Sequence, residues 1–392
     1  MTIIEFFDDN ALLNAFSTLL LHPDRLILFG SNLQRMHAFA RQMHSLLEMR
    51  NQKTDIQVVG IHADNHEEIA QRLQRIITLY PDCVFDVSGG DTPILVSMGA
   101  LSARHGVPMH TVDPLHNTFS VISGTYPPVN FPVTLSVEEI ITLFGGHVSS
   151  SFAPSLTNTS FFSDVTAAWS VCRRNSTLWN NAIGAMHTVF QNNDSLFSTV
   201  DTKEAKRKLS PQKYAQMKTL LTELSSANLL TGCRITHDTI SFSYKNLSVS
   251  QLLSKAGTTL ELYTYQTAQK FAPSLFQDAK TGVVIDWQPQ AQANSFDSVT
   301  NEIDVFLTSG VLPVFISCKN GFTNSDELYK LSVVAKRFGG TYAKKMIVLT
   351  QFVPDDTFME RAKELGIFVI YNVHRMSSET FAEKLRTGLS KY

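Results

Sequence analysis

The 392-residue sequence predicts an α/β protein in three parts: a doubly wound sheet at residues 1–147, a mostly helical middle at 148–249, and a second, mixed α/β layer at 250–392. Two observations support this division. In the first part, short apolar runs alternate with amphipathic helical stretches, as parallel strands and their crossover helices do. In the third part, strand and helix periodicities alternate again, whereas the middle has mainly helical periodicity. At roughly 100–200 residues per domain, the length fits two or three domains.

The first part contains five apolar runs of strand length with two amphipathic segments between them. The runs lie at 2–7, 25–29, 55–61, 83–88 and 109–112, and the amphipathic segments at 33–49 and 66–80. Runs that are apolar on both faces are typical of strands buried between two layers of helices. We therefore expect a Rossmann-like, doubly wound α/β domain.

The middle part opens with a segment rich in Ser, Thr, Asn and Pro at 149–163, which indicates a linker or long loop. Helical periodicity follows at 165–191 and 211–230, and residues 231–244 alternate as a hairpin does. A winged helix and a helical connector with a β-arm explain this order equally well. A basic stretch here either guides a nucleic-acid backbone or forms a solvated helix face: Lys203, Lys206, Arg207, Lys208, Lys213 and Lys218.

The third part begins with a predicted helix at 250–270. Its other expected elements are strands at 282–287, 301–308, 311–317, 345–350 and 367–371, and helices at 325–338 and 356–365. The first of these two helices is followed by Gly339 and Gly340, a pair suited to a left-handed helix end. A helix, three meandering strands, a helix and returning strands make one mixed sheet.

Composition restricts the class of protein only weakly. With 43% hydrophobic and 17% charged residues and a formal charge of −2, each part can bury a core, and the charge balance excludes no partner. The four cysteines form no zinc-type pair, so we expect reduced thiols. The start of the chain has no basic region typical of a signal peptide, and no apolar run reaches the roughly 20 residues that span a bilayer. These features predict a cytoplasmic protein without membrane contact.

Candidate chemical groups occur in the third part, on two strands and a helix. Glu302 and Asp304 share one face of the strand at 301–308, because side chains alternate along a strand, and Ser317 and Lys319 share one face of the next strand. A short turn between the strands can place Asp304 beside Lys319. Upstream, Glu261 lies on the helix expected to pack over this sheet.

Phosphodiester hydrolysis needs a water nucleophile and neutralisation of charge on phosphorus, and divalent ions held by carboxylates can supply both. Mg²⁺ and Mn²⁺ prefer oxygen ligands. An acid on a helix, an acid on a strand and a lysine on the next strand follow the order of PD-(D/E)XK nucleases. We therefore predict a metal-dependent endonuclease in which Glu261 and Asp304 bind Mn²⁺ or Mg²⁺ and Lys319 stabilises charge.

One position departs from that pattern. The acid usually found two residues before the lysine is replaced by Ser317. The vacant ligand position could be filled by Glu302 or by the backbone carbonyl of Cys318, which we include as a candidate metal ligand. A purely structural interpretation also exists, in which Asp304 and Lys319 form a cross-strand ion pair and Glu261 is a solvated helix residue.

Two segments of the third part, NEIDVFLTSGVLPVFISCKNG and ELYKLSVVAKRFGG, resemble the nuclease domain of the CARF-domain nucleases that accompany type III CRISPR systems. The resemblance implies a restriction-endonuclease-like domain that cleaves single-stranded DNA or RNA in antiviral defence. It also implies that Asp304 binds the metal, that Lys319 assists the attacking water and that Glu261 is the helix acid. Basic residues near this layer are candidate nucleic-acid contacts: Lys336, Arg337 and Lys344.

In the first part, the strand at 83–88 runs into a glycine-containing loop. Gly89 and Gly90 allow a close backbone approach to a ligand, and the helix beginning at Thr92 presents free amides that attract phosphate. Asp91 would repel an anion and suits a ribose hydroxyl or an adenine amino group better. An ordinary turn followed by a capped helix explains the loop equally well.

Residues 88–92, Ser-Gly-Gly-Asp-Thr, resemble the glycine-pair motif of CARF domains, although the lysine of that motif is absent. The resemblance implies a ligand-sensing domain and a homodimer that shares one ring-shaped cyclic oligoadenylate. Cyclic tetra-adenylate, a two-fold symmetric ring, would fit as the activator on a two-fold axis. The expected ligand contacts are Asp8, Asn10, Gly30, Ser31, Asn32, Ser88, Gly89, Gly90, Asp91, Thr92 and Asp113.

Together these features predict an endonuclease activated by cyclic tetra-adenylate. Two alternatives remain open. One is a ligand-sensing, DNA-binding regulator with an inactive nuclease fold. The other is a constitutive repair or restriction nuclease. The sequence does not distinguish RNA from DNA as the substrate.

Overall fold

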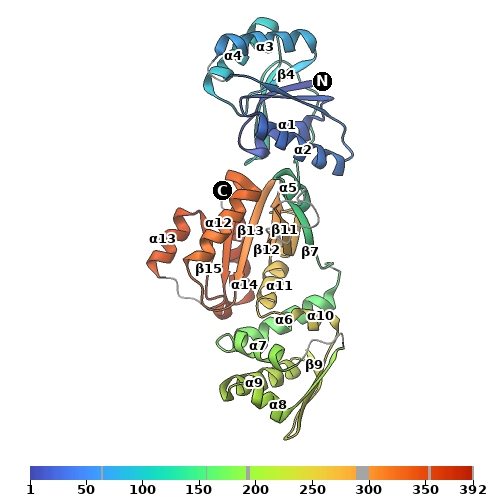
Figure 1. Cartoon of the computed structure of the whole chain (residues 1–392), viewed down its shortest axis with the longest axis vertical. Coiled ribbons are helices and arrows are strands. Elements are labelled where there is room, and N and C mark those ends of the chain that lie inside the picture. The colour runs from blue at the N-terminus through green and yellow to red at the C-terminus, as the bar shows by residue number, and fades with distance from the viewer. Residues whose placement is uncertain (63–64, 156, 191–194, 288–299, 352–354, 391–392) are drawn as a thin grey trace.

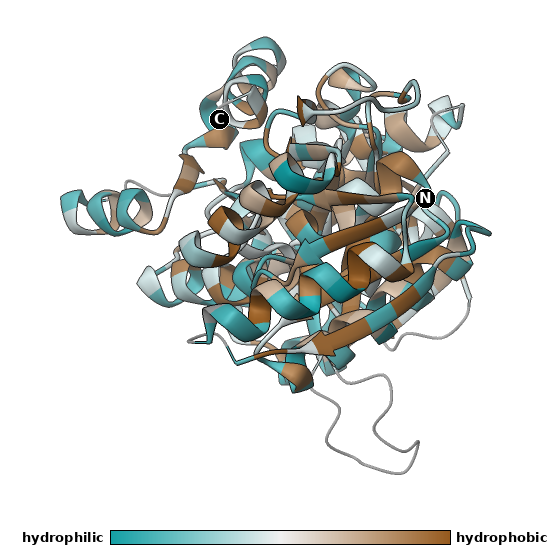
Figure 2. Cartoon of the chain, turned by 90° about the horizontal axis from the view of Figure 1, so that it is seen from above, coloured by the Kyte–Doolittle hydropathy of each residue, from teal (hydrophilic) through white to brown (hydrophobic). Residues whose placement is uncertain are grey.

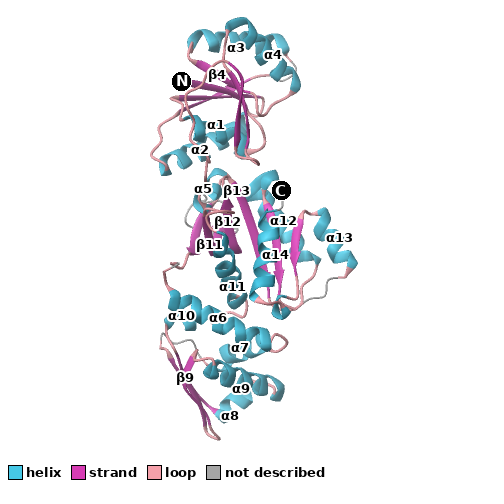
Figure 3. Ribbon diagram, turned by 180° about the vertical axis from the view of Figure 1, so that it is seen from behind, coloured by secondary structure: helices cyan, strands magenta, loops and turns pink. Residues whose placement is uncertain are grey.

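The computed structural model describes residues 1–62, 65–155, 157–190, 195–287, 300–351 and 355–390. Figure 1 shows three parts stacked along the long axis of the molecule. The N-terminal part lies at one end, the middle of the sequence at the other, and the C-terminal part between them. Figure 3 shows the same order from behind, with separate sheets in the three parts. The order in space therefore differs from the order in sequence.

The N-terminal part is built on a sheet with strand order β3-β2-β1-β4-β5-β6. Its strands are β1 (Thr2–Phe6), β2 (Arg25–Gly30), β3 (Asp55–Gly60), β4 (Cys83–Asp86), β5 (Met109–Asp113) and β6 (Thr118–Ser123). The first five are parallel and β6 is antiparallel. The doubly wound sheet predicted from the apolar runs is confirmed.

Helices cover both faces of this sheet because successive side chains of a strand point to opposite sides. Ile3 belongs to the core under α1 (Ala11–Leu21) and α2 (Leu33–Met49). Its neighbour Ile4 belongs to the core under α3 (His66–Leu79) and α4 (Thr92–His105). Figure 2 shows the resulting pattern, hydrophobic strands flanked by helices with hydrophilic residues.

The C-terminal part has a mixed sheet with strand order β15-β14-β13-β12-β11-β7. Its strands are β7 (His147–Phe152), β11 (Asp278–Asp286), β12 (Thr300–Ser309), β13 (Leu312–Lys319), β14 (Lys344–Leu349) and β15 (Ile367–Ile370). Neighbouring strands from β7 through β11 and β12 to β13 pair antiparallel, and β13, β14 and β15 pair in parallel. The helices are α11 (Thr258–Ala268), α12 (Ser325–Gly339), α13 (Asp356–Glu364) and α14 (Ser378–Ser390).

Two expectations for this sheet are wrong. The segment 149–163, expected as a loop, begins with β7, which is an edge strand and mostly exposed, so its serines show no apolar alternation. The single helix expected at 250–270 is two helices, α10 (Leu247–Leu252) and α11. The chain turns between them through residues 253–257, where Gly257 immediately precedes α11.

The middle part has the order of elements of a winged helix, one of the two arrangements that its sequence left open. It contains α6 (Thr159–Arg174), α7 (Trp179–Val189), β8 (Phe197–Asp201), α8 (Thr202–Lys208), α9 (Pro211–Ser226), β9 (Leu230–Ile235) and β10 (Thr239–Tyr244). The helices α8 and α9 form a helix-turn-helix, and β9 and β10 form the wing, with β8 as the third strand of their sheet.

Two hydrophobic cores connect the three parts. One contains residues of α1 and α2 together with residues of β11, β13 and α12, joined through α5 (Val137–Leu143). The other contains residues of the winged helix together with residues of α11, β12 and β13. The C-terminal sheet is thus fixed against both neighbours. Within the described residues, no helix is long and apolar enough to cross a membrane.

Candidate active site

The candidate site lies where strands β12 and β13 separate. They pair as far as Val305 and Ile316. Beyond that point β12 continues beside β11, and β13 continues beside β14 as far as Lys319. Separation of the strands frees backbone groups from pairing. One of them, the amide of Cys318, donates a hydrogen bond of 2.6 Å to Oδ2 of Asp304.

Asp304 and Lys319 lie together at this separation, as the sequence predicts. Lys319 Nζ is 3.7 Å from Oδ2 of Asp304 and 3.3 Å from Oε2 of Glu327 on α12. Burial opposes the charge of Lys319, but the two carboxylates outweigh it and raise its pKa. Lys319 is therefore a fixed positive charge beside Asp304.

Burial has the opposite consequence for Asp304. It raises the pKa of the carboxyl group, although Lys319, the Cys318 amide and the Ser317 hydroxyl all favour the charged form. Ser317 Oγ donates to Oδ2 of Asp304 at 3.2 Å. The serine that replaces the usual acid thus contacts the metal-ligand candidate directly.

Glu261 reaches the same place from the first turn of α11. Burial raises its pKa to about 8, with further contributions from the negative charges of Asp304 and Glu302. Because an electrostatic effect of this kind requires proximity, the helix acid and the strand acid lie close together. The three predicted catalytic residues therefore lie near one another, Asp304 and Lys319 in one cavity and Glu261 in an adjoining cavity that shares Glu302 with it.

The donor set at this point fits a divalent cation. Partial burial raises the pKa of both carboxyl groups, the charge of Asp304 raises that of Glu261 further, and within the described residues Glu261 makes no hydrogen bond or ion pair. A cation with oxygen ligands would remove the cost of ionising both groups. No three His, Cys, Asp or Glu side chains of the described residues form a metal-binding group, so water or phosphate oxygens would complete the coordination.

Cys318 contributes to this set at most through its backbone. Its thiol is buried, contacts Thr264 Oγ1 at 3.6 Å, and has a pKa raised well above the ordinary value by burial and by Asp304. A thiol that stays protonated is a poor ligand. The carbonyl of Cys318 remains the predicted ligand atom.

Sequence reasoning missed three charged residues around the site. Glu327 and Lys330 of α12 line a cavity of about 300 Å³ together with Asp304 and Lys319. Lys255, before α11, lies 3.5 Å from Glu302, which borders this cavity as well as a second one beside Glu261. An acid in the first turn of a helix is common, so no local signal in the sequence marked Glu327.

Of the three predicted nucleic-acid contacts, the structure contradicts Lys344, and it places Lys336 and Arg337 toward the end of α12 that is remote from Glu327. Lys344 is 7% exposed and donates to the carbonyl of Leu389, so it is a buried structural residue. Arg337 donates to the carbonyl of Phe144, close to the N-terminal part. Lys336 follows Glu327 by nine residues of α12, which is about 13 Å at 1.5 Å per residue. The exposed lysines nearest the site are instead Lys255 and Lys330.

The predicted ligand contacts of the N-terminal part meet at the carboxyl edge of its sheet. A Cβ atom added to Gly89 would lie 2.9 Å from Cβ of Asp8, and one added to Gly90 would lie 2.9 Å from Phe6. Gly90 also has a φ of +121°. Both glycines are therefore required by the close packing of this loop on the end of β1.

Several residues of this edge have structural contacts as well. Asn10 and Asn32 cap α1 and α2, and Asp113 accepts the amide of Leu115. Ser88 is bonded to Asp86 and accepts the amide of Val112. Of the other predicted contacts, Gly30 ends β2, Ser31 follows it, and Asp91 and Thr92 stand at the start of α4.

A direct contact joins this edge to the C-terminal part. Asn10 Nδ2 donates to Oγ1 of Thr341 at 3.1 Å. Thr341 belongs to the short 3₁₀ helix η2 (Gly340–Tyr342), which directly follows α12. One hydrogen bond thus connects the carboxyl edge of the N-terminal sheet to the residues that directly follow α12, the helix that carries Glu327.

Residues 251–378 match the family of Card1-like endonuclease domains. This region is an endonuclease domain. The Card1-like domain includes α11, β12, β13 and α12, and so it contains all three predicted catalytic residues. The match confirms the predicted class of enzyme, a nuclease, and the relationship that the sequence segments indicated.

Solved structures resemble the chain over almost its whole length. Protein VC1899 from Vibrio cholerae has a TM-score of 0.74 at 17% identity and covers 99% of this chain and 97% of its own. Can2 from Sulfobacillus thermosulfidooxidans, solved in complex with cyclic tetra-adenylate, has a TM-score of 0.69 at 18% identity, with coverage of 100% and 97%. At such identities the likeness shows a shared fold.

A third structure, a type III CRISPR defence DNA nuclease activated by cyclic oligoadenylate, has a TM-score of 0.51 at 13% identity. It covers 90% of this chain and 46% of its own. Among curated proteins, no match to the sequence is found. The three-part arrangement of the chain therefore recurs in at least two full-length structures, independently of close sequence similarity.

Proposed function

We propose that the chain is a metal-dependent endonuclease that cleaves single-stranded DNA or RNA when cyclic tetra-adenylate binds its N-terminal part, as an effector of type III CRISPR antiviral defence. The observation that carries this proposal is the gathering of Glu261, Asp304 and Lys319 at the separation of β12 and β13 within an endonuclease domain.

In this proposal each residue has one role. Asp304 and Glu261 hold Mn²⁺ or Mg²⁺, which when bound supplies an activated water and neutralises phosphate charge. Lys319, kept protonated by Asp304 and Glu327, stabilises negative charge that develops on the phosphate. Glu302 borders the same cavity, but among the described residues it forms no three-carboxylate group with Asp304 and Glu261, so water or phosphate oxygens would take the position of the acid missing at position 317.

The activator site is supported by the carboxyl edge of the N-terminal sheet, where crevices of open α/β sheets bind their ligands. Its loops contain paired glycines in close contact with β1. Can2, which shares the fold, was solved with cyclic tetra-adenylate. A symmetric ring would be shared by two chains, so the proposal includes a homodimer.

Activation requires the ligand to favour one arrangement over another through differential affinity. We propose that the bond from Asn10 to Thr341 carries this difference. A change at Asn10 would reach α12 through Thr341, and α12 holds Glu327 against Lys319.

The experiment is cleavage of labelled single-stranded DNA and RNA with Mn²⁺, with and without cyclic tetra-adenylate. The wild-type protein should cut only with the nucleotide. Asp304→Asn should lower the rate at least about a thousandfold, whereas the control Glu364→Gln, at an exposed site on α13, should cut normally. Cleavage by Asp304→Asn at the wild-type rate would refute the proposed catalytic site, and equal cleavage without the nucleotide would refute the sensor.

The winged helix favours a second candidate function, recognition of duplex DNA by a ligand-sensing regulator. The exposed face of α9 carries small and polar side chains that permit close approach to a groove, among them Gln212, Lys213, Ala215 and Thr219. This function requires sequence-specific duplex binding that Lys213→Gln weakens. If such binding occurs and no strand is cut with Mn²⁺ and the nucleotide, the regulator replaces the nuclease.

A further inference from the structure

A second cavity opens directly beside the candidate active site. Its volume is about 320 Å³, within the range of roughly 300–1,000 Å³ for small-molecule sites. Glu261 and Glu302 form the border that it shares with the active site. Its other walls come from α10 and from residues on β7 and α6, so it lies between the endonuclease sheet and the winged helix. Apart from the acidic residues at that border, none of the residues that line this cavity has a role in the proposed catalysis.

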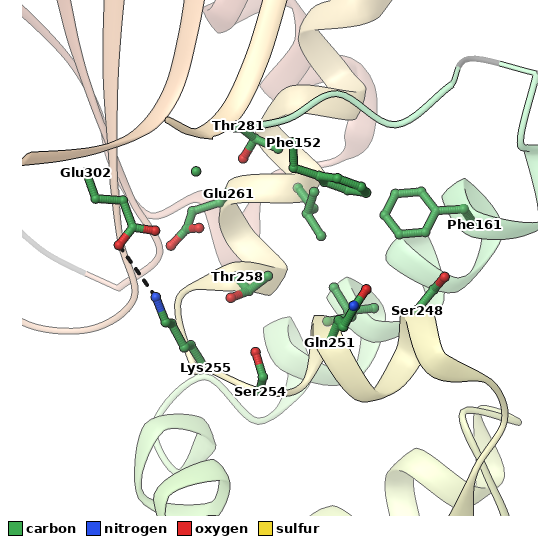
Figure 4. Close-up of a pocket in the computed structure, with 13 residues that line it drawn as sticks. Phe152, Phe161, Ser248, Gln251, Ser254, Lys255, Thr258, Glu261, Thr281 and Glu302 are labelled. Carbon is green, nitrogen blue, oxygen red and sulfur yellow. Dashed lines mark hydrogen bonds and ion pairs between the residues drawn. The ribbon is translucent and has the colours of Figure 1, made fainter. Parts of the chain in front are cut away.

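One wall of the cavity is aromatic. Phe152, at the end of β7, is 46% exposed although it borders a cavity, and Phe161 of α6 supports it at 5.8 Å between ring centroids and an interplanar angle of 76°. Figure 4 shows the two rings on the side of the cavity opposite Glu302 and Lys255. An exposed ring held by an edge-on neighbour is a platform on which a nucleobase can stack.

The adjoining wall is polar. Gln251, Ser254 and Thr258 line the cavity, and Figure 4 shows Gln251 and Ser254 along its lower side, below the rings and the carboxylates. Within the described residues, the side-chain amide of Gln251 has no hydrogen-bond partner, so its donor and its acceptor are both available. An amide offers the donor and acceptor pair that recognises the edge of a base.

The border with the active site carries a positive charge that can contact the phosphate backbone of a nucleic-acid strand. Lys255 is 69% exposed and lies 3.5 Å from Glu302, so its ammonium group stands at the entrance from the carboxylates to the cavity. A phosphate held by a metal at Asp304 and Glu261 would place the neighbouring nucleotide at this entrance. Lys255 would then contact the backbone, and the base would enter the cavity.

We infer that the cavity bordered by Phe152, Gln251 and Glu261 is a subsite for one unpaired nucleobase next to the bond that is cut. The inference rests on the proposed nuclease function and deepens it. A base whose face lies on Phe152 and whose edge faces Gln251 cannot pair with a complementary strand at the same time. The subsite therefore selects a single strand, or a nucleotide displaced from a duplex, as the substrate.

The test compares full-length wild-type protein with Phe152→Ala and Phe152→Tyr by fluorescence anisotropy. The ligands are a labelled single-stranded DNA, its blunt duplex, and a strand of the same length with abasic sites. Cyclic tetra-adenylate is present throughout, and Ca²⁺ replaces Mn²⁺ in the binding measurements to prevent cleavage. Phe152→Ala should bind the intact strand roughly tenfold more weakly than wild type, because one base loses its stacking partner. It should bind the abasic strand as wild type does. Phe152→Tyr retains a ring and should bind both strands normally.

Phe131→Ala is the matched control, since Phe131 is 44% exposed and belongs to the N-terminal part. It should bind the intact strand as wild type does. A second variant, Gln251→Ala, replaces an exposed helix residue with the best helix former and should keep the fold. It should change the ratio of cleavage rates between oligo-dA and oligo-dT about fivefold, because the amide reads the edge of the base.

The outcomes separate this inference from the nuclease proposal. Suppose that wild-type protein binds and cuts the single strand, and that Phe152→Ala has the same affinity as wild type for both the intact and the abasic strand. The subsite is then wrong and the nuclease proposal stands. Tighter binding of the duplex than of the single strand would likewise overturn the subsite. If wild-type protein neither binds nor cuts nucleic acid, both proposals fail.

Discussion

Ser317 is the residue at which the chain departs from the usual PD-(D/E)XK pattern, and its contacts explain how the site tolerates it. Its hydroxyl donates to Asp304 at 3.2 Å, beside the stronger bond from the Cys318 amide. Two donors on one carboxylate oxygen hold Asp304 in a fixed orientation, at the cost of one metal ligand. Because the described residues contain no group of three acidic ligands, water or phosphate oxygens would replace it.

Glu261 has a consequence for stability that can be measured without metal. Its carboxyl group ionises near the ordinary value of 4.5 in an unfolded chain and at about 8 in the folded protein, where burial opposes its charge. Between these values the folded chain binds more protons than the unfolded chain does. The free energy of unfolding therefore falls as the pH rises from about 4.5 to about 8.

We expect Glu261→Gln to abolish this fall in the free energy of unfolding, because the glutamine side chain does not ionise. The measurement is urea unfolding with EDTA at pH 5 and pH 9. Between these two values the free energy of unfolding of the wild-type protein should fall by a few kcal/mol more than that of the variant, since one pKa unit corresponds to about 1.4 kcal/mol. The exposed Glu364→Gln should follow the wild type. Parallel pH profiles for Glu261→Gln and wild type would contradict the raised pKa of Glu261.

At the scale of elements, α12 connects the two ends of the proposed mechanism. Its first turn carries Glu327, which holds Lys319, and its last residue precedes η2, where Thr341 accepts the bond from Asn10. Non-helical backbone angles at Phe338 put a kink near the end of α12, between η2 and the turn that carries Glu327. We propose that the bond to Asn10 is the place at which a ligand at the carboxyl edge influences the catalytic lysine.

We expect Thr341→Val, which keeps the shape of the side chain but removes the acceptor, to reduce the stimulation of cleavage by cyclic tetra-adenylate. A loss of about fivefold in the ratio of stimulated to basal rate is expected for one hydrogen bond worth about 1 kcal/mol. Thr341→Ser keeps the hydroxyl and should retain the stimulation. Equal ratios in all three proteins would exclude this bond as the connection.

At the scale of the whole molecule, the endonuclease sheet is held between the other two parts by continuous cores. One core joins it to the N-terminal part and the other to the winged helix. Contacts of this extent make independent motion or unfolding of the parts costly. The cavity beside Glu261 lies at the border of the sheet with the middle part, which supplies some of its walls, whereas β12, β13 and α12 alone line the cavity at Asp304.

We expect a single thermal transition in calorimetry, and Phe144→Ala should lower its midpoint by several degrees. Phe144 is 8% exposed in the core that joins α5, α2 and the endonuclease sheet, and truncation of a buried phenylalanine costs about 3–5 kcal/mol. Leu79→Ala, at a 70% exposed site on α3, should change the midpoint little. A transition that splits in two would show that the parts unfold separately.

The sequence by itself determined the features that depend on neighbours along the chain. Apolar runs predicted the doubly wound sheet, because strands buried on both faces need apolar residues at every position. The period of two placed Asp304 with Glu302 on one face of β12 and Lys319 with Ser317 on one face of β13, and the short turn between the strands brought Asp304 near Lys319. These inferences need only local geometry, and the structure bears them out.

Only the tertiary structure decided which elements meet. It placed the C-terminal part between the other two, turned the serine-rich segment after residue 147 into an edge strand, and buried Lys344 under α14. It also brought Glu327 to Lys319 and Phe152 to the border of the active site. Local periodicity fixes the face to which a side chain points, but what covers that face depends on contacts between segments far apart in the sequence, which no local pattern encodes.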